Sequence, residues 1–366
     1  MPQFTSFDHQ MMSRAISLAK RGIFTTTPNP NVGCVIALGE QIVGEGYHRK
    51  AGEPHAEVHA MRMAGEKAVG ATAYVTLEPC SHYGRTPPCA LGLIKAGVTK
   101  VICAMTDPNP QVAGRGIRML QEAGVEVLVG LLEQDARALN PAFLTRMERG
   151  RPYVQLKMAA SLDGQTALAN GRSQWITSPQ ARKDVQHYRA LASAVLSTSQ
   201  TVLADNASLN VRWSELPTAI QEEYPEQELR QPTRVILDRQ HQLTPELKLY
   251  ATDGPVLTVA HSAADICVAV DEDQQLSLVD TLEQLASVHN INHVWVEAGA
   301  TLAKSFIEQE LVDEIVLYLA PKIMGSDGRG LFGALGLTDM SQVQNFTIKD
   351  LRQVGPDIRV VLTPKN

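Results

Sequence analysis

Cysteines, basic clusters and long apolar runs are all scarce in this 366-residue chain, and each shortage excludes a class of protein. Five cysteines are an odd and low number, which argues against the disulfide framework of a small secreted domain. No uncharged apolar run approaches the length of a membrane span, and residues 1–20 lack the basic start and apolar centre of a secretory signal. We therefore expect a cytoplasmic protein that does not associate with membranes.

Positive charge is also too thinly spread for a nucleic-acid-binding surface. Residues 1–150 carry 15 Lys and Arg against 13 Asp and Glu, and residues 151–366 carry 18 against 26, so the two parts have charges of +2 and −8. Neither part has the dense basic stripe of a protein that binds phosphate backbones. We expect a small-molecule substrate and no nucleic-acid partner.

The length and composition of the chain indicate two ordinary globular domains. The chain is 44% hydrophobic and 20% charged, and 366 residues exceed the size of one typical core. A charged connector is predicted at residues 146–152, so we place the domains at residues 1–147 and 148–366. Helices and strands follow one another along the first part, which predicts an α/β layered fold.

The segment from His55 to Glu57, followed by Cys80 and Cys89, has the composition of a catalytic metal site. One imidazole and two thiols suit zinc, and three protein ligands leave the fourth tetrahedral position to water, whereas a structural site usually has four protein ligands. The order His-x-Glu, then Pro-Cys, then a further Cys matches the zinc nucleobase deaminases. We therefore predict that His55, Cys80 and Cys89 bind one Zn²⁺.

Glu57 is the predicted catalytic residue. Zinc lowers the pKa of a bound water towards ~7, so that this water loses a proton near neutral pH. Glu57 would take that proton and pass it to a ring nitrogen and to the leaving ammonia. Cys89 is predicted to open a helix, whose positive end favours a thiolate.

Two other histidines permit alternative interpretations. His59 lies four residues after His55, but the order His-Ala-Glu-Val-His puts the glutamate one place too late for a HExxH metallopeptidase helix. We interpret His59 as a packed or surface residue. His82, in the eight-residue segment between the two cysteines, is predicted either to contact the substrate or to act as a fourth zinc ligand.

Asn29 lies in a proline-rich loop at residues 27–31, between a predicted helix at residues 7–22 and a predicted β-hairpin at residues 32–44. The loop either presents amides to the edge of a heterocycle or is a simple turn from helix to strand. A short strand at residues 73–77 is predicted to deliver Cys80 at its end.

Four stretches of the first part closely resemble the bifunctional deaminase/reductase family of riboflavin biosynthesis, and the resemblance extends over nearly the whole chain. They are the residues TPNPNVGC at 27–34, GEPHAE at 52–57, TLEPCSH at 76–82 and GRTPPC at 84–89. The resemblance implies a cytidine-deaminase-like three-layer α/β/α domain and then a dihydrofolate-reductase-like α/β domain. It also implies a homo-oligomer, with a dimer as the expected form.

The same resemblance implies two successive reactions. The first is zinc-dependent deamination of 2,5-diamino-6-(5-phosphoribosylamino)pyrimidin-4-one at its 2-position. The second is NADPH-dependent reduction of the ribosyl group to ribityl, which gives 5-amino-6-(5-phosphoribitylamino)uracil.

The implied binding residues form two sets. Substrate contacts are expected from Asn29, His82, Lys157, Ser173, Arg189, Leu209, Arg212 and Glu297. Cofactor contacts are expected from Ala159, Trp175, Thr201, Asp205, Arg239, Gly299, Ala300, Thr301, Leu302, Ala303, Lys304 and Ser305. The two arginines would bind the substrate phosphate, because the planar guanidinium can make paired hydrogen bonds to it. On spacing alone, Lys157 could be a solvated lysine and each arginine a surface ion-pair residue.

The second part has local signals for these roles. A helix is predicted to begin after Ser178 with Pro179 in its first turn, and residues 201–205 resemble a strand and turn beside the cofactor. A strand at 293–297 is followed by small residues and a helix to Gln309, an arrangement that suits the pyrophosphate of a dinucleotide.

Three positions depart from the family pattern. Asn206-Ala207 stands where Asp-Pro is commoner, which leaves the local geometry of that loop open. Residues 90–92 replace a segment that often carries a cysteine and an aspartate, and they lie beyond the third ligand, so no loss of zinc is expected. Arg239 stands where serine is common, and its charge suits the 2′-phosphate of NADPH.

Two rival functions differ in kind from the leading one. A tRNA deaminase would share the zinc pattern, but the missing basic stripe and the large second part argue against it. A zinc-stabilised binding module without catalysis is the other alternative, and it would not need Glu57.

Overall fold

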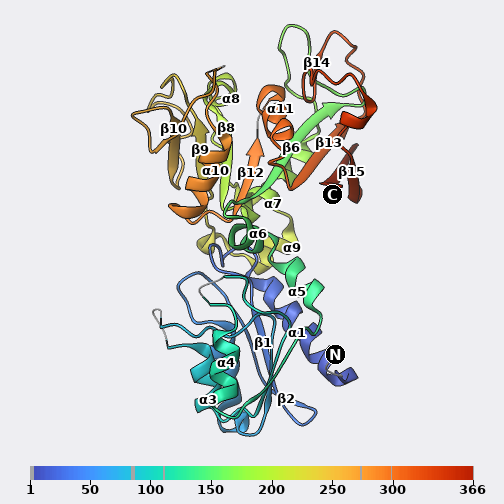
Figure 1. Ribbon diagram of the computed structural model, residues 1–366. Coiled ribbons are helices and arrows are strands. Elements are labelled where there is room, and N and C mark those ends of the chain that lie inside the picture. Colours follow the sequence, from blue (N-terminus) through green and yellow to red (C-terminus); the bar gives the residue numbers. More distant parts are fainter. Residues whose placement is uncertain (1–3, 84–86, 110–111, 273, 298, 366) are drawn as a thin grey trace. The chain divides into compact units, whose positions relative to one another are not determined.

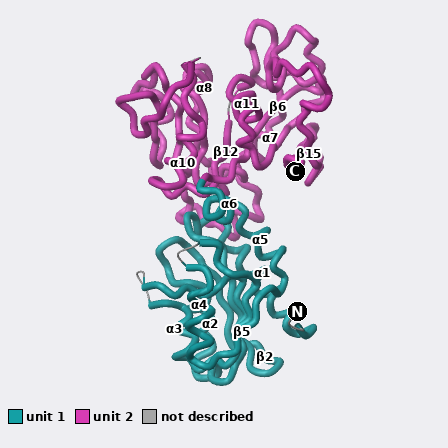
Figure 2. Tube along the Cα trace, viewed as in Figure 1, with its two compact units in different colours: residues 1–150 teal, residues 151–366 magenta. Residues whose placement is uncertain are grey.

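The computed structural model describes residues 4–83, 87–109, 112–272, 274–297 and 299–365, and the chain divides into two compact units (Figures 1 and 2). Unit 1 comprises residues 1–150 and unit 2 residues 151–366, and each has its own sheet and hydrophobic core. Among the described helices, none combines the length and apolarity that crossing a membrane requires.

The elements of unit 1 are α1 (Ser6–Ala19), β1 (Gly33–Leu38), β2 (Gln41–Tyr47), α2 (Ala56–Ala64), β3 (Thr72–Val75), α3 (Cys89–Lys95), β4 (Lys100–Cys103), α4 (Arg115–Glu122), β5 (Glu126–Val129), α5 (Glu133–Leu139) and α6 (Pro141–Arg149). The described strands form a sheet in the order β2-β1-β3-β4-β5, with β3, β4 and β5 parallel. The predicted hairpin, the strand before Cys80 and the helix that begins at Cys89 are all present.

Unit 1 is a three-layer sandwich because the two faces of its sheet are both apolar. On β1, Cys34 and Ile36 pack with α2 and α3, whereas Val35 and Ala37 pack with α1. Successive strand residues point to opposite faces, so one continuous apolar strand can serve both layers. The predicted α/β/α class is confirmed.

Glycines let α2 pack tightly against the hairpin. A Cβ added to Gly44 would lie 2.1 Å from the Ala60 carbonyl oxygen, and one added to Gly46 would lie 2.6 Å from that of Ala56. Real Cβ contacts are not that short, so only glycine permits this approach of helix to strand. The first turn of α2, beside His55, is thereby fixed against the sheet.

The predicted connector between the domains is partly helical. Residues 146–149 are the last turn of α6, which begins with Pro141 in its first turn, where the missing proline N–H costs nothing. Gly150 ends the helix with a φ of 70°, and the units divide directly after it. The division therefore falls at residue 150, three residues beyond the predicted boundary.

The elements of unit 2 are β6 (Tyr153–Ser161), β7 (Gln165–Ala167), α7 (Pro179–Leu191), β8 (Ala194–Thr198), α8 (Ser199–Asp205), α9 (Thr218–Glu223), β9 (Thr233–Leu237), β10 (Val256–Ala260), β11 (Ile266–Cys267), α10 (Leu278–Ser287), β12 (His293–Glu297), α11 (Ala300–Glu308), β13 (Glu314–Ala320), β14 (Arg329–Gly330), β15 (Phe346–Val354) and β16 (Asp357–Pro364). The described strands form a large sheet in the order β11-β10-β9-β8-β12-β6-β13-β16-β15 and a small sheet of β14 and β7.

The large sheet is parallel from β11 to β13 and ends in an antiparallel pair, β16 and β15. Helix α7 packs on one face, with Tyr188 and Trp295 in its cluster, and α10 and α11 pack on the other. From the neighbouring strands β8 and β12, the chain continues toward opposite edges of the sheet. Strand β8 leads to β9 on one side, and β12 leads across β6 to β13 on the other. In such sheets, ligands bind at the carboxyl ends of the strands beside this reversal.

One predicted element of unit 2 is wrong. Residues 201–205 were expected to be a strand and turn, but they belong to helix α8, whose N-cap Thr198 accepts a hydrogen bond from the Thr201 N–H at 3.2 Å. The strand of this region is β8, which ends at Thr198. Helix α7 begins as predicted, with Ser178 as its N-cap.

Candidate functional sites

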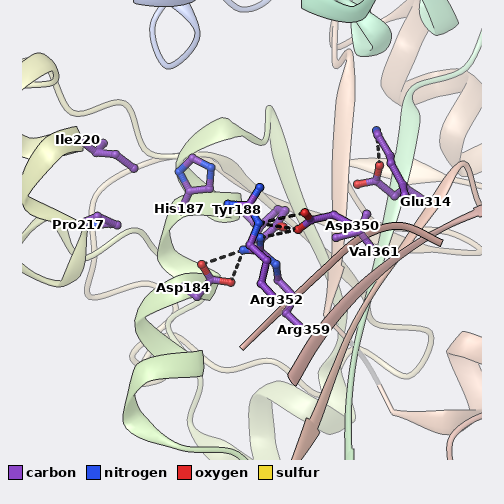
Figure 3. A pocket seen from close by; sticks show the side chains of 11 residues that line it. Asp184, His187, Tyr188, Pro217, Ile220, Glu314, Asp350, Arg352, Arg359 and Val361 are labelled. Atoms are coloured by element: carbon purple, nitrogen blue, oxygen red, sulfur yellow. Dashed lines mark hydrogen bonds and ion pairs between the residues drawn. The ribbon is translucent and has the colours of Figure 1, made fainter. Parts of the chain in front are cut away.

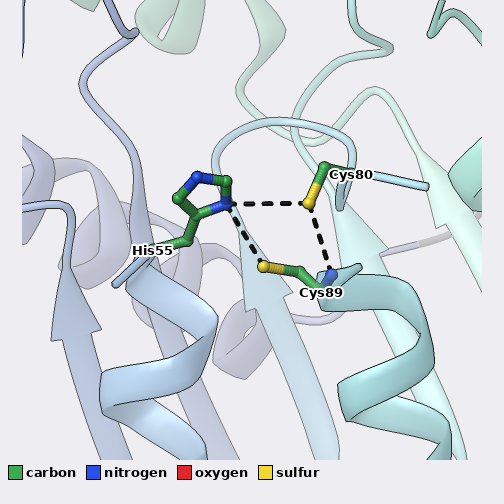
Figure 4. A group of neighbouring side chains, drawn as sticks. All are labelled: His55, Cys80 and Cys89. Atoms are coloured by element: carbon green, nitrogen blue, oxygen red, sulfur yellow. Dashed lines mark hydrogen bonds between the residues drawn. The ribbon is translucent and has the colours of Figure 1, made fainter. Parts of the chain in front are cut away.

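Three soft ligand groups converge at the carboxyl end of β3 in unit 1 (Figure 4). His55 is the N-cap of α2, Cys80 follows β3, and Cys89 is the first residue of α3. The His55 Nδ1 lies 3.6 Å from the Cys80 Sγ and 3.3 Å from the Cys89 Sγ, and the three ligand atoms lie within 4.8 Å of one another. The structure therefore brings the three predicted ligands together.

The electrostatics of this cluster favour a thiolate. Hydrogen bonding from the Cys89 side chain, together with the neighbouring His55, lowers the pKa of Cys80. The Cys89 backbone N–H, in the first turn of α3, also points at the Cys80 Sγ at 3.3 Å. The hydrogen bond with Cys80 raises the pKa of His55. The cluster therefore favours a thiolate beside a partly positive imidazole. A divalent cation would bind the thiolate and take the place of the proton on the imidazole.

Glu57 lies in the first turn of α2, beside the cluster, and its side chain is buried with 3% exposure. Its Oε2 has no hydrogen-bond partner among the described residues. Burial raises the pKa of Glu57 to about 7. A buried carboxyl group with an unpaired oxygen and a pKa near neutrality is suited to accept and release a proton.

These observations fit zinc as the bound metal. Two thiols and an imidazole are ligands that zinc prefers, and three protein ligands leave a position open. Neither His59 nor His82 belongs to the described ligand cluster. His59 lies on α2 against Gly46, and His82 is exposed in the loop after Cys80. Part of the predicted Gly84–Cys89 motif, residues 84–86, lies outside the described residues.

Asn29 is held by a histidine that the sequence analysis did not identify. The Asn29 amide nitrogen lies 3.1 Å from the His48 Nε2, and the His48 Nδ1 lies 3.2 Å from the Pro54 carbonyl oxygen. An imidazole that donates from Nδ1 and accepts at Nε2 satisfies both contacts. The His48 ring also meets the His55 ring edge-on, at 5.4 Å between centroids.

The asparagine loop holds two asparagines in different surroundings. Asn29 lies beside the cluster, because its partner His48 contacts His55. Asn31 is a structural residue: its Oδ1 accepts from the Thr26 hydroxyl at 2.7 Å, and its N–H donates to the Asn140 Oδ1 at 2.7 Å. His48 directly follows strand β2, but the hairpin predicted from the sequence ended at residue 44, so no sequence signal pointed to this residue.

In unit 2, a buried ion pair stands at the carboxyl end of β12. The Arg189 Nε and Nη2 donate to the two oxygens of Glu297 at 2.6 and 2.9 Å, and the Arg189 Nη1 donates to the Asn210 carbonyl oxygen at 2.9 Å. Burial opposes ionisation of Glu297, but the guanidinium outweighs it and holds the pKa of Glu297 at about 2. Two of the N–H groups of Arg189 are therefore hydrogen-bonded to Glu297.

Lys157 and Trp295 complete this group. Lys157 is the register partner of Glu297 on the neighbouring strand β6, and burial lowers its pKa although Glu297 opposes the shift. The Trp295 indole N–H donates to Glu297 at 2.9 Å, and its ring stacks on Tyr188 at 4.7 Å. Trp295 was not predicted, because only the fold turns this core residue's N–H toward the site.

The remaining predicted substrate residues differ in their surroundings. Ser173 is exposed, and Arg212 pairs with Glu215 at 2.7 Å while about two-fifths of its side chain remains exposed. The side chain of Leu209 is buried in the cluster on the α7 face. Leu209 as a whole is 3% exposed.

Most of the predicted cofactor residues lie at the carboxyl ends of the parallel strands. Gly299 is the N-cap of α11 and provides no side-chain cap, and residues 300–305 form the first turns of that helix. Arg239 is exposed after β9, and Thr201 lies in the first turn of α8. Ala159 lies on β6, two residues after Lys157.

The other two predicted cofactor residues, Trp175 and Asp205, are joined through Gln174. The Gln174 side-chain amide donates to the Asp205 Oδ1 at 2.6 Å, and the Trp175 ring lies under the Arg182 guanidinium at 4.4 Å. The Lys322 ammonium donates to the Trp175 carbonyl oxygen at 2.8 Å. These contacts connect the loop before α7 with α8 and with the segment after β13.

A separate cavity of about 570 Å³ lies between α7 and the C-terminal strands (Figure 3). Its charged groups are already paired: Arg359 binds Asp184 and Asp350, and Lys349 binds Glu314. None of the predicted site residues lines it. The cavity therefore adds no free charge that would select a ligand.

The fold and the two sites define a two-domain protein that joins a deaminase-type zinc-binding domain to a reductase-type domain. Residues 5–105 match the family model of the cytidine and deoxycytidylate deaminase zinc-binding region, and residues 152–360 match that of the RibD C-terminal domain. The chain belongs to the RibD family of riboflavin biosynthesis proteins. Membership confirms the expectation of a bifunctional deaminase and reductase.

Relatives and solved structures agree over the full length. The chain is 53% identical to the riboflavin biosynthesis protein RibD of Haemophilus influenzae, covering 100% of both chains, and 54% identical to that of Escherichia coli, covering 96% and 98%. A RibD structure from Acinetobacter baumannii matches with a TM-score of 0.91 at 46% identity, over 98% of this chain and 99% of that one.

A second structure is named for both activities. It is a diaminohydroxyphosphoribosylaminopyrimidine deaminase/5-amino-6-(5-phosphoribosylamino)uracil reductase from Thermotoga maritima. It matches with a TM-score of 0.83 at 34% identity and covers 98% of this chain and 99% of its own.

The pair of Arg189 and Glu297 makes a testable contribution to stability. We expect Arg189→Met to lower the free energy of unfolding of unit 2 by about 3–5 kcal/mol, because a buried carboxylate would lose its cation. The double variant Arg189→Met/Glu297→Gln should recover part of that loss. Denaturant melts would measure both. The exposed pair of Arg212 and Glu215 is the control, and Arg212→Met should cost less than about 1 kcal/mol.

The contribution of Glu297 to the free energy of unfolding depends on pH with a definite sign. The folded pKa of Glu297, about 2, lies below its unfolded value of about 4.3, so the stabilisation is complete above pH ~4.3 and declines as the pH falls towards 2. Glu297→Gln should remove that acid-dependent part. If Arg189→Met and Arg212→Met lower the free energy of unfolding by the same amount, the pair of Arg189 and Glu297 is not stabilising.

Proposed function

We propose that unit 1 deaminates 2,5-diamino-6-(5-phosphoribosylamino)pyrimidin-4-one. Unit 2 then reduces the ribosyl group of the deaminated product with NADPH. The Thermotoga maritima relative is named for a deaminase and a reductase of this kind. The observation that most directly supports the first step is the buried Glu57, with an unpaired oxygen beside His55, Cys80 and Cys89. The free thiols of this cluster favour a reducing, cytoplasmic setting.

The deamination replaces a C–NH₂ bond with a C=O bond and consumes one water. Zinc, when bound by His55, Cys80 and Cys89, supplies a Lewis acid that makes a water nucleophilic near neutral pH. Glu57 would carry two protons in turn, one from the attacking water to the ring nitrogen and one from the resulting hydroxyl group to the amino group, which leaves as ammonia. Asn29 is oriented by His48 through its amide nitrogen, and its Oδ1 accepts a hydrogen bond from the pyrimidine edge. His82 is a further substrate contact at the rim.

The reduction takes place at the carboxyl ends of β6, β8 and β12. NADPH supplies a hydride to the sugar carbon that bears the amine, and the ring oxygen that leaves this carbon gains a proton. Lys157, a half-buried lysine paired in register with Glu297, donates that proton. Glu297 binds sugar hydroxyls, with its orientation held by Arg189 and Trp295.

The substrate and cofactor phosphates are assigned to separate groups. Arg189 retains donors for the substrate phosphate, and Arg212 and Ser173 lie at exposed positions where they can join it. The backbone of Leu209 lines the same side. The N-terminus of α11 receives the cofactor pyrophosphate, while Thr201, Asp205, Trp175 and Ala159 surround its nicotinamide half.

Glu57→Ala tests the first step. We expect ammonia release from the diaminopyrimidine ribotide to fall by about 10²- to 10⁴-fold while zinc is retained, because the proton shuttle is lost and the ligands remain. The variant should still oxidise NADPH, followed at 340 nm, when given the deaminated ribotide. The control, Glu66→Ala, removes an exposed glutamate of the same unit. If Glu57→Ala releases ammonia at the wild-type rate, Glu57 is not the proton shuttle. If the wild type releases ammonia but does not oxidise NADPH, unit 2 is not a reductase for this product.

Arg239→Glu tests the cofactor preference. A carboxylate in place of the guanidinium should repel the adenosine 2′-phosphate, so we expect the NADPH/NADH ratio of kcat/KM to fall by about tenfold or more, equivalent to about 1.4 kcal/mol. Lys183→Glu reverses a charge at an exposed position on α7 and should leave the ratio near the wild-type value. If Arg239→Glu leaves the ratio unchanged, Arg239 does not contact that phosphate.

We also propose that the chain forms a homodimer through the C-terminal hairpin. The register pairs Ile348 with Leu362 and Leu351 with Val360, so these side chains share one face of the sheet, and Ile348 and Leu351 are 61% and 63% exposed. Strand β15 is also the edge of the sheet. An apolar face beside an open edge favours a second copy of the same surface.

Leu351→Lys tests the dimer. We expect the wild type to have twice the 39.8 kDa chain mass by light scattering, and the variant to dissociate at micromolar concentration because a charge replaces the apolar contact. Val288→Lys, at an exposed apolar residue at the end of α10, is the control. A monomeric wild type, or identical masses for both variants, would contradict this interface.

A further inference from the structure

A second buried carboxylate in unit 1, that of Glu78, lies two residues before the ligand Cys80. Glu78 is 3% exposed. Its Oε1 accepts hydrogen bonds from the backbone N–H groups of Gly116 and Ile117 at 2.8 and 3.2 Å. Its Oε2 accepts from those of Asp107 and Gly114 at 3.1 and 2.9 Å. Four N–H donors thus surround one carboxylate.

Most of these donors belong to the start of helix α4. The N-cap of α4, Gly114, offers no side-chain hydrogen bond, and the first turn of the helix contains no acidic residue. The first N–H groups of a helix need an acceptor, and its N-terminus favours negative charge. Glu78 therefore caps α4 from a distant part of the sequence.

The backbone shows independently that the two segments are fixed together. A Cβ added to Gly116 would lie 1.9 Å from the Pro79 carbonyl oxygen, so α4 packs directly on the residue between Glu78 and Cys80. The Glu78 N–H also donates to the Met105 carbonyl oxygen at 3.0 Å. The segment that presents Cys80 is thus joined to Met105, to Asp107 and to the start of α4 by both side chain and backbone.

We propose that Glu78 is a positioning residue for the deaminase site: it fixes the Cys80 segment to the loop before α4 and to the N-terminus of that helix. This inference rests on the proposed function of unit 1. Its consequence is that the position of the Cys80 thiol, and of the loop carrying Asp107, depends on a group that touches neither metal nor substrate. Residues that orient metal ligands affect metal affinity and activity without binding the metal themselves.

Glu78→Gln is the sharpest test, because it keeps the size of the side chain and changes its hydrogen bonding. A carboxamide has one accepting oxygen, and its NH₂ group would face two backbone N–H donors. We expect zinc to transfer to a competing chelator about 10- to 100-fold faster than from the wild type. The kcat/KM for ammonia release should fall by a similar factor, while reduction of the deaminated ribotide in unit 2 remains unchanged.

The matched control is Glu122→Gln, which removes the same charge from an exposed position in the last turn of α4. If both variants lose zinc at the same rate and have the same kcat/KM, the proposal is wrong, even if Glu78→Gln melts at a lower temperature. If the wild type releases no ammonia, the proposed function fails, whereas zinc transfer still tests the role of Glu78.

Hydrogen exchange of the wild type decides the case if Glu78→Gln does not fold. The amides of Gly116 and Ile117 should exchange about tenfold or more slowly than the first-turn amides of α11, whose N-cap Gly299 provides no side-chain acceptor. Equal exchange rates in the two helices would overturn the proposal.

Discussion

Burying a carboxylate is costly unless its charge is compensated, and the three buried glutamates near the two sites are compensated in three different ways. Glu297 has the guanidinium of Arg189 and the indole N–H of Trp295. Glu78 has four backbone N–H groups and, among the described residues, no salt bridge to a cation. Glu57 has an oxygen without a partner among the described residues. Donors therefore compensate Glu297 and Glu78, whereas Glu57 keeps one oxygen unpaired among the described residues.

Both sites lie where parallel strands end. In unit 1, the end of β3 supplies Cys80, and the N-termini of α2 and α3 bring His55 and Cys89 to it. In unit 2, the carboxyl ends of β6, β8 and β12 meet the first turns of α8 and α11. Helix N-termini favour anions, which suits thiolates in one unit and phosphates in the other. The same backbone arrangement therefore recurs at both candidate sites.

The sequence predicted the residues whose chemistry is unusual, and it missed those whose role depends on a distant partner. Cys80 and Cys89 stood out because metal-binding thiols follow a recognisable order. His48, Trp295 and Glu78 did not, since each acts through a contact made only in the fold. The region of residues 201–205 was misassigned because the resemblance alone was taken to indicate a strand and turn, whereas the Thr198 cap begins a helix there.

By itself, the sequence indicated the class of chemistry, a candidate ligand set and the division into two parts, because residue type, order and hydrophobic period are local properties. The fold of the second part was expected only from the family resemblance. Only the tertiary structure decided which charges are compensated. It paired Arg189 with Glu297, although the sequence separates them by 108 residues, and it placed the start of α4 on Glu78. Such pairings follow from how the strands and helices pack, so no local pattern can predict them.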